Sequence, residues 1–110
     1  MSHVFYIKRG DTAPSVEATL RNPGSAQGLP GPAIDLTAAT GVRFLMEGGL
    51  AEDAVIVDAA AGQVRYDWAA GETDTPGTHD AEFEITWGDG RKQTVPNGEY
   101  IKVVIAADLG

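Results

Sequence analysis

The chain has 110 residues, which allows one compact domain with a core that needs no covalent crosslinks, and we expect a single domain over residues 1–110. It contains no cysteine, which excludes disulfides, thiolate metal sites and a cysteine nucleophile. Sixteen acidic and eight basic residues give a formal charge of −8, which disfavours nucleic acid and anionic membranes as partners. The N-terminal sequence lacks the features of a signal peptide, and no apolar run approaches the roughly 20 residues of a membrane span. We therefore expect a soluble chain made in the cytosol.

The first elements in chain order are two short strands separated by a turn. Residues 4–8 predict a strand that ends at the Gly- and Pro-containing stretch 9–14, because both residue types disfavour continuation of a β-ladder. Residues 15–21 predict a second strand, in which Val16 and Leu20 share the inward face. The following stretch, 22–32, is rich in Gly and Pro and predicts an exposed loop, which Leu29 could anchor to another surface.

The middle of the chain alternates in the same way. Residues 35–40 are compatible with no more than a single helical turn, because Gly41 follows. Residues 42–47 predict a strand that ends at Gly48-Gly49, and in this strand Leu45 is an apolar residue on the polar face. That position indicates either a subunit contact or an isolated apolar surface residue.

The second half of the chain gives the clearest pattern. Residues 54–58 and 62–68 predict two paired strands joined by a turn of about four residues. After a loop at 69–77, residues 78–87 and 91–95 predict an antiparallel hairpin, because Asp89-Gly90 tolerates the positive φ angles of a tight type I′ turn. Residues 99–106, entered through a turn at 96–98, predict the last strand. Short strands at regular spacing favour an all-β sandwich of two antiparallel sheets.

Residues that could carry chemistry are few. A hydrolase triad could draw only on two histidines, His3 and His79, and three serines. We therefore expect no enzyme activity and no catalytic residues. Acidic residues in loops are better explained by solvation than by a calcium site, and we expect no metal and no cofactor. The two tryptophans, Trp68 and Trp87, lie in the apolar register of strands and are more typical of core residues than of sugar-stacking platforms. Edge strands of a small sandwich are either blunted by charge or pair with a neighbour, and assembly is the simplest use of the latter.

Several stretches together carry a resemblance to a known family. They are Tyr6–Pro14 before Val16–Leu20, Ile34–Phe44, Val64–Trp68, Thr75–Thr78, Ala81–Ile85 before Asp89-Gly90, and Pro96–Gly98 at the entry to the last strand. The chain resembles the immunoglobulin-like N-terminal domain found in baseplate upper proteins of tailed phages of the siphovirus type. The resemblance covers nearly the whole chain and implies an immunoglobulin-like antiparallel β-sandwich of about seven to nine strands.

The resemblance also implies a function. It implies a non-enzymatic structural protein of a tailed-phage virion, assembled in the host cytoplasm, that docks in multiple copies into the tail tip, baseplate or neck. The partners would be other tail, baseplate, neck or capsid proteins. Alternatives are a capsid decoration protein and a carbohydrate or host-surface binding module. Candidate assembly contacts are apolar residues that a monomer gains nothing by exposing: Val4, Phe5, Tyr6, Ile7, Leu29 and Leu45.

Overall fold

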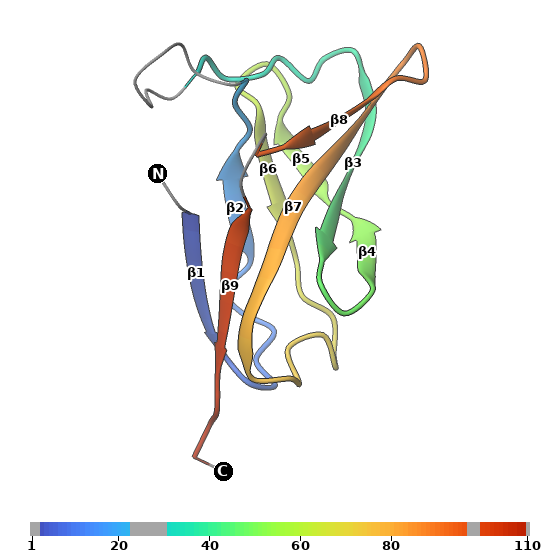
Figure 1. The fold of residues 1–110 in the computed structure, drawn as a ribbon. Helices are drawn as coiled ribbons and strands as arrows, with labels where there is room; N and C mark the ends of the chain where they lie inside the picture. Colours follow the sequence, from blue (N-terminus) through green and yellow to red (C-terminus); the bar gives the residue numbers. More distant parts are fainter. Residues whose placement is uncertain (1–2, 23–30, 97–99, 110) are drawn as a thin grey trace.

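The computed structural model describes residues 3–22, 31–96 and 100–109, and in these ranges the chain forms nine β-strands and no helix. The strands form two packed layers (Figure 1). They are β1 His3–Lys8, β2 Val16–Thr19, β3 Ala39–Met46, β4 Leu50–Asp53, β5 Val55–Asp58, β6 Gln63–Tyr66, β7 Gly77–Trp87, β8 Lys92–Val95 and β9 Ile101–Ala106. The predicted all-β, immunoglobulin-like sandwich is therefore confirmed. Within the described ranges, nothing has the length and apolar character of a membrane-spanning helix.

The larger sheet, sheet A, has the order β1-β9-β7-β3-β4, and β8 pairs with the end of β7 that β9 does not reach. The smaller sheet, sheet B, has the order β2-β6-β5. One part of the prediction is wrong: sheet A is mixed, because β1 pairs with β9 in parallel. The reason is that residues 9–15 carry the chain from one layer to the other, so β1 lies beside the last strand instead of forming a hairpin with β2.

The core lies between the two sheets and is built by alternation along the strands. Phe44 of β3 joins the layers: its ring stacks on Tyr66 with centroids 4.6 Å apart and meets the edge of Phe83 at 5.2 Å. Trp68 closes this aromatic cluster at 5.6 Å from Phe44. Such pairs contribute about 0.5–1.5 kcal/mol each beyond the area that they bury. The inward register predicted for these strands is confirmed.

The β7–β8 hairpin is confirmed, but its turn is not the predicted two-residue type I′. The amide of Gly90 donates to the carbonyl of Trp87 at 2.9 Å, and Trp87 N donates to Arg91 O at 2.8 Å. Gly90 has a φ of +89°, whereas the φ of Gly88 lies outside the positive region. This pattern fits a three-residue loop, in which a left-handed glycine follows the turn.

The stretch before β3 stays within the predicted limit of a single turn, whereas one neighbouring strand was missed. In residues 35–40, Ala39 N donates to Leu36 O at 2.9 Å and the carboxylate of Asp35 accepts a hydrogen bond from Thr37 N at 2.9 Å, and β3 begins directly afterwards at Ala39. Ala39 is already paired with Trp87 of β7, so sheet pairing overrides the local helix propensity. Strand β4 was not predicted, because its four residues lie at an edge and show no clear alternation.

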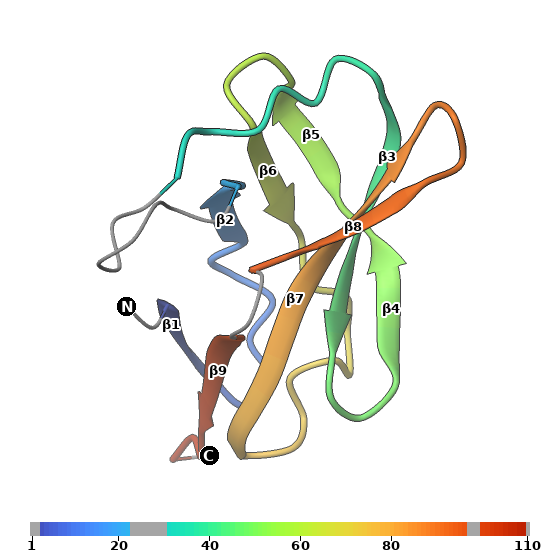
Figure 2. The same cartoon turned by 45° about the horizontal axis from the view of Figure 1, so that its top comes forward.

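Hydrogen bonds hold the loops at both ends of the sandwich against neighbouring segments. At one end, the connection through residues 31–38 crosses over the β5–β6 turn to β3 (Figure 2): Leu36 N donates to Ala59 O at 2.7 Å, and Gly88 N of the β7–β8 turn donates to Ala38 O at 3.0 Å. At the other end, Thr73 is the buried polar side chain of the loop after β6, and its hydroxyl donates to the carbonyl of Asp11 at 2.8 Å. This bond anchors the loop to the crossover that follows β1.

Candidate interaction surface

Strand β1 is an edge of sheet A. It pairs with β9 on one side, and no described strand pairs with its other side. Arg9 N donates to Ala106 O of β9 at 2.7 Å. Because backbone groups alternate in direction along a strand, the amides of Phe5 and Ile7 also face β9. The amides of Val4 and Tyr6 therefore point toward the open edge.

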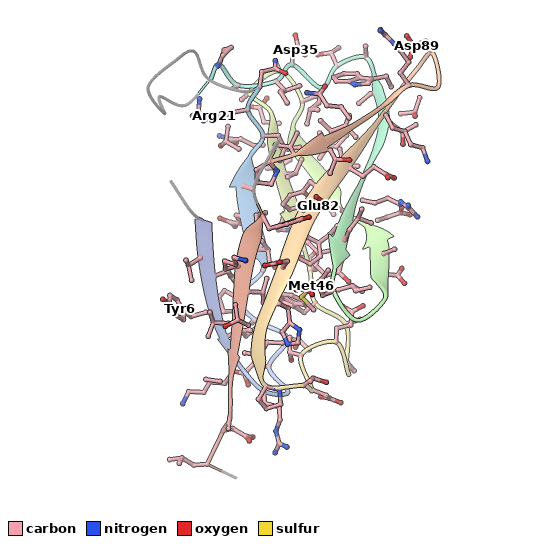
Figure 3. All side chains as sticks on the ribbon, viewed as in Figure 1. Tyr6, Arg21, Asp35, Met46, Glu82 and Asp89 are labelled. Atoms are coloured by element: carbon pink, nitrogen blue, oxygen red, sulfur yellow. The ribbon has the colours of Figure 1, made fainter. Side chains whose placement is uncertain are left out.

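The side chains of β1 divide between the two faces of sheet A. Phe5 packs against the core at 6.1 Å from the Trp68 ring, and Ile7 is only 5% exposed. These two candidates for assembly contacts therefore face the core, because the period of two places Phe5 and Ile7 on the same inner face. Val4 and Tyr6 point outward with 45% and 71% exposure, and Figure 3 shows Tyr6 projecting away from the domain.

Neighbouring outward residues of β9 extend this surface. Val104 is paired with Tyr6 and is half-buried, and Tyr100, just before β9, is exposed. We call Val4, Tyr6, Tyr100 and Val104 the β1–β9 strip. Three of its four members are among the six exposed large apolar or aromatic side chains of the described residues, so exposed apolar area is concentrated there.

The cation beside the strip is already neutralised. The ammonium of Lys102 lies 5.9 Å from the centre of the Tyr100 ring and forms an ion pair with Asp80 of β7. The hydrogen bond from Lys102 to Asp80 raises the pKa of the ammonium above its ordinary value, so it stays charged and paired. Asp80 is thus not a free carboxylate beside the strip.

Leu45 lies on the same outer face, next to the strip. It is half-buried and lines an open hollow of about 300 Å³, together with Met46, Glu47, Asp80, Glu82 and Tyr100. Figure 3 shows Glu82 on β7, on the face of sheet A turned toward the reader. The carboxylate of Glu47 already has one partner, because its Oε1 atom accepts a hydrogen bond from the backbone amide of Asp80 at 2.6 Å. The remaining predicted contact, Leu29, lies outside the described residues.

The other described sheet edges differ from β1 because they are protected. Strand β4 carries Glu52 and Asp53, and β2 carries Glu17. Strand β5 exposes Val57, but its register with β6 shifts between Ile56 and Asp58, and such irregularity disrupts the ladder. Strand β8 has only four residues and begins with a lysine. Carboxylates, bulges and short length all hinder pairing with another chain, so β1, six residues long, without a carboxylate and with Lys8 at its end, is the least protected edge.

Described residues that could carry chemistry form hydrogen bonds within the domain. The Nε2 atom of His79 lies 2.9 Å from the carbonyl oxygen of Thr75, which fixes the loop before β7. Glu72 accepts hydrogen bonds from the Tyr66 hydroxyl at 2.6 Å and from the Ala69 amide at 2.7 Å. Burial, followed by this bond to Glu72, raises the pKa of Tyr66. Among the described residues, no group of three or more His, Asp or Glu side chains could hold a metal ion.

Comparison with known proteins gives one structural match and no sequence match. No family model and no curated protein matches the chain. The chain is similar to the crystal structure of CopC from Methylosinus trichosporium OB3b, with a TM-score of 0.52 and 11% sequence identity over 99% of this chain and 89% of that chain. At this identity the likeness shows the β-sandwich fold alone.

These findings correct the predicted function. The predicted docking role in a tailed-phage virion is wrong, because the solved structure matched here is CopC and not a phage structural protein. No finding bears on the baseplate family itself. The carbohydrate alternative loses one of its two candidate platforms, since Trp68 is 5% exposed and packs within the aromatic cluster, whereas Trp87 is half-buried beside the core.

Proposed function

We propose that this chain is a non-enzymatic protein-interaction domain that binds an extended segment of another polypeptide at the open edge of β1. The observation that carries this proposal is the least protected edge: the amides of Val4 and Tyr6 in β1 face away from β9, and the strand has no carboxylate and two exposed apolar or aromatic side chains. Strand addition to such an edge derives affinity from main-chain hydrogen bonds and specificity from alternate side chains.

The β1–β9 strip supplies the side-chain part of this recognition. An added antiparallel or parallel strand would lie roughly 4.8 Å from β1, and every second side chain would fall beside Val4 and Tyr6. A segment with apolar residues at alternate positions would cover the exposed part of both. Because Ile7 is buried and Phe5 packs against the core, they fix the position of β1 and leave its outer edge presented to solvent.

The proposal is tested with a synthetic peptide that copies β1, residues 3–8, added in excess to the isotope-labelled protein. With the protein diluted until it is monomeric, we expect chemical-shift changes centred on Val4, Tyr6 and Lys8 and slower hydrogen exchange at the amides of Val4 and Tyr6. A peptide N-methylated at alternate residues is the control, because it keeps the side chains and loses the backbone donors. Shift changes centred on Val55 and Val57, or none up to about millimolar peptide, would contradict the proposal.

Tyr6→Pro is the matching variant of the protein. It removes an amide that faces the open edge and not β9, so the β1–β9 ladder keeps its hydrogen bonds. We expect it to abolish peptide binding while the aromatic cluster around Trp68 keeps its near-ultraviolet circular dichroism. Val57→Ala, an exposed valine on the β5 edge, is expected to leave binding unchanged.

A further inference from the structure

We infer that the strand bound at the β1 edge is β1 of a second copy of this chain, paired antiparallel about a two-fold axis at Tyr6. This inference rests on the proposed function, because it names the occupant of the same edge. Two independent features of the described residues carry it: the register that β1 allows with itself, and the distribution of charge over the sheet edges.

The register follows from the alternation of β1. Residues that face each other across an antiparallel pair project to the same side of the sheet, so even-numbered residues must meet even-numbered residues for sheet A to continue through both copies. An axis at Tyr6 places Tyr6 opposite Tyr6, Val4 opposite Lys8 and Phe5 opposite Ile7. On the outer face the two Tyr6 side chains lie opposite each other, and on the inner face Phe5 lies opposite Ile7. Lys8 lies opposite Val4, so the two lysines do not face each other. The strand is thus complementary to itself.

The distribution of charged residues over the sheet edges also favours self-pairing at β1. Each copy carries a formal charge of −8, so two copies repel each other wherever their carboxylates approach. At physiological ionic strength only charges within about 8 Å of each other interact strongly, so the local composition of the edge decides. Self-pairing at β4 would bring Glu52 and Asp53 together, and self-pairing at β2 would bring Glu17 toward its copy. Residues 1–10 contain Lys8 and Arg9 and no acid.

The local cations do not oppose this contact. Arg9 forms an ion pair with Asp108 at 3.0 Å, and Lys102 forms one with Asp80. Lys8 takes part in none of the ion pairs between described side chains, so it is the cation of β1 that matters for self-pairing. In the proposed register the two Lys8 side chains lie at opposite ends of the paired strands. The edge of least repulsion is therefore also the edge with the exposed apolar strip.

The chain has no cysteine, so single-cysteine variants give a direct test. Residues directly opposite in a hydrogen-bonded antiparallel pair have Cα atoms about 5.5 Å apart, within the range that a disulfide spans. We expect Tyr6→Cys to form a covalent dimer under mild oxidation. Val57→Cys, an exposed position on the β5 edge, is the matched control and should crosslink about tenfold more slowly.

Sedimentation velocity measures the association itself. The unmodified chain should sediment as a dimer of the 11.5 kDa protomer, and Tyr6→Pro should sediment as the monomer. An unmodified chain that stays monomeric at about 1 mM overturns the inference. So does a dimer that survives Tyr6→Pro, or one that Val57→Cys traps as fast as Tyr6→Cys.

The outcome also separates this inference from the proposed function. A monomer that binds the β1 peptide at its β1 edge refutes self-pairing and leaves strand addition in place, with a different protein as partner. A monomer that does not bind the peptide refutes both. If the dimer forms as described, excess β1 peptide should shift the sedimentation profile toward the monomer, because both occupy one edge.

Discussion

Gly62, between β5 and β6, offers the sharpest test of the packing, because its backbone lies against two other segments. A Cβ atom at this position would lie 2.6 Å from the carbonyl oxygen of Ile34 and 3.0 Å from that of Leu20. The Leu20 carbonyl already accepts a bond from Ile34 N at 2.8 Å, and Leu20 N donates to Gly62 O at 2.8 Å. Gly62→Ala must therefore push apart hydrogen-bonded backbone, which cannot yield as a flexible side chain does.

The magnitude follows from a comparison with Gly10→Ala. Both glycines have positive φ, +70° at Gly62 and +82° at Gly10, but among the described residues nothing lies within 4 Å of a Cβ built at Gly10. Left-handed backbone costs alanine about 1–2 kcal/mol, and the stiffer unfolded chain offsets about 0.4–1 kcal/mol of this. Gly10→Ala should thus cost about 1 kcal/mol. Overpacking adds about 1–3 kcal/mol, so Gly62→Ala should cost about 3 kcal/mol.

Urea unfolding of both variants, followed by tryptophan fluorescence, gives the two free energies of unfolding. The expected gap of about 2 kcal/mol corresponds to roughly 8–12 °C in melting temperature for a domain of this size. Equal losses in the two variants would show that φ strain alone acts, and the reasoning from close approach at Gly62 would then be refuted.

Two further predictions concern the loop after β6. Thr73→Val removes the hydroxyl that donates to the Asp11 carbonyl and should cost about 1–2 kcal/mol of unfolding free energy in urea titrations, whereas Thr73→Ser should recover most of it. The raised pKa of Tyr66 means that the folded chain keeps a proton that the unfolded chain releases above about pH 10. Stability should therefore fall above that pH by about 1.4 kcal/mol per pH unit more than in Tyr66→Phe, and equal slopes in the two proteins would contradict the assigned burial.

The sequence predicted the fold where a local pattern and the tertiary structure agree. The alternation in residues 78–87 specified both the strand and its buried face, because a one-residue slip would expose Phe83 and Ile85. It did not reveal the parallel pairing of β1 with β9, since that contact joins residues about a hundred positions apart and depends on how the crossover at 9–15 is directed. Strand β4 was missed because an edge strand needs only one partner and no periodic pattern.

The interaction surface could be predicted only in part. The sequence singled out residues 4–7 because they are apolar near a terminus, but apolar character alone does not separate the inward Phe5 and Ile7 from the outward Val4 and Tyr6. That separation requires the position of β1 in sheet A. The unpaired outer edge of β1 likewise follows from the order of strands in the sheet. The lack of acidic residues in positions 1–10 of an acidic chain could nevertheless have pointed to this segment.

The same contacts that stabilise β1 also prepare it for strand addition. Its inner face is held by Phe5 and Ile7, its end by the ion pair of Arg9 with Asp108, and the following turn by the bond from Gly10 N to Thr73 O at 3.2 Å. An edge strand without such anchors would have to become ordered when it binds, and the loss of conformational entropy would weaken the complex. Because β1 is already fixed in an extended conformation, only the incoming strand loses that freedom. Anchoring of this kind would allow the short edge to bind a second strand as proposed, and it connects the loop at Thr73, remote from the edge, to the position of β1.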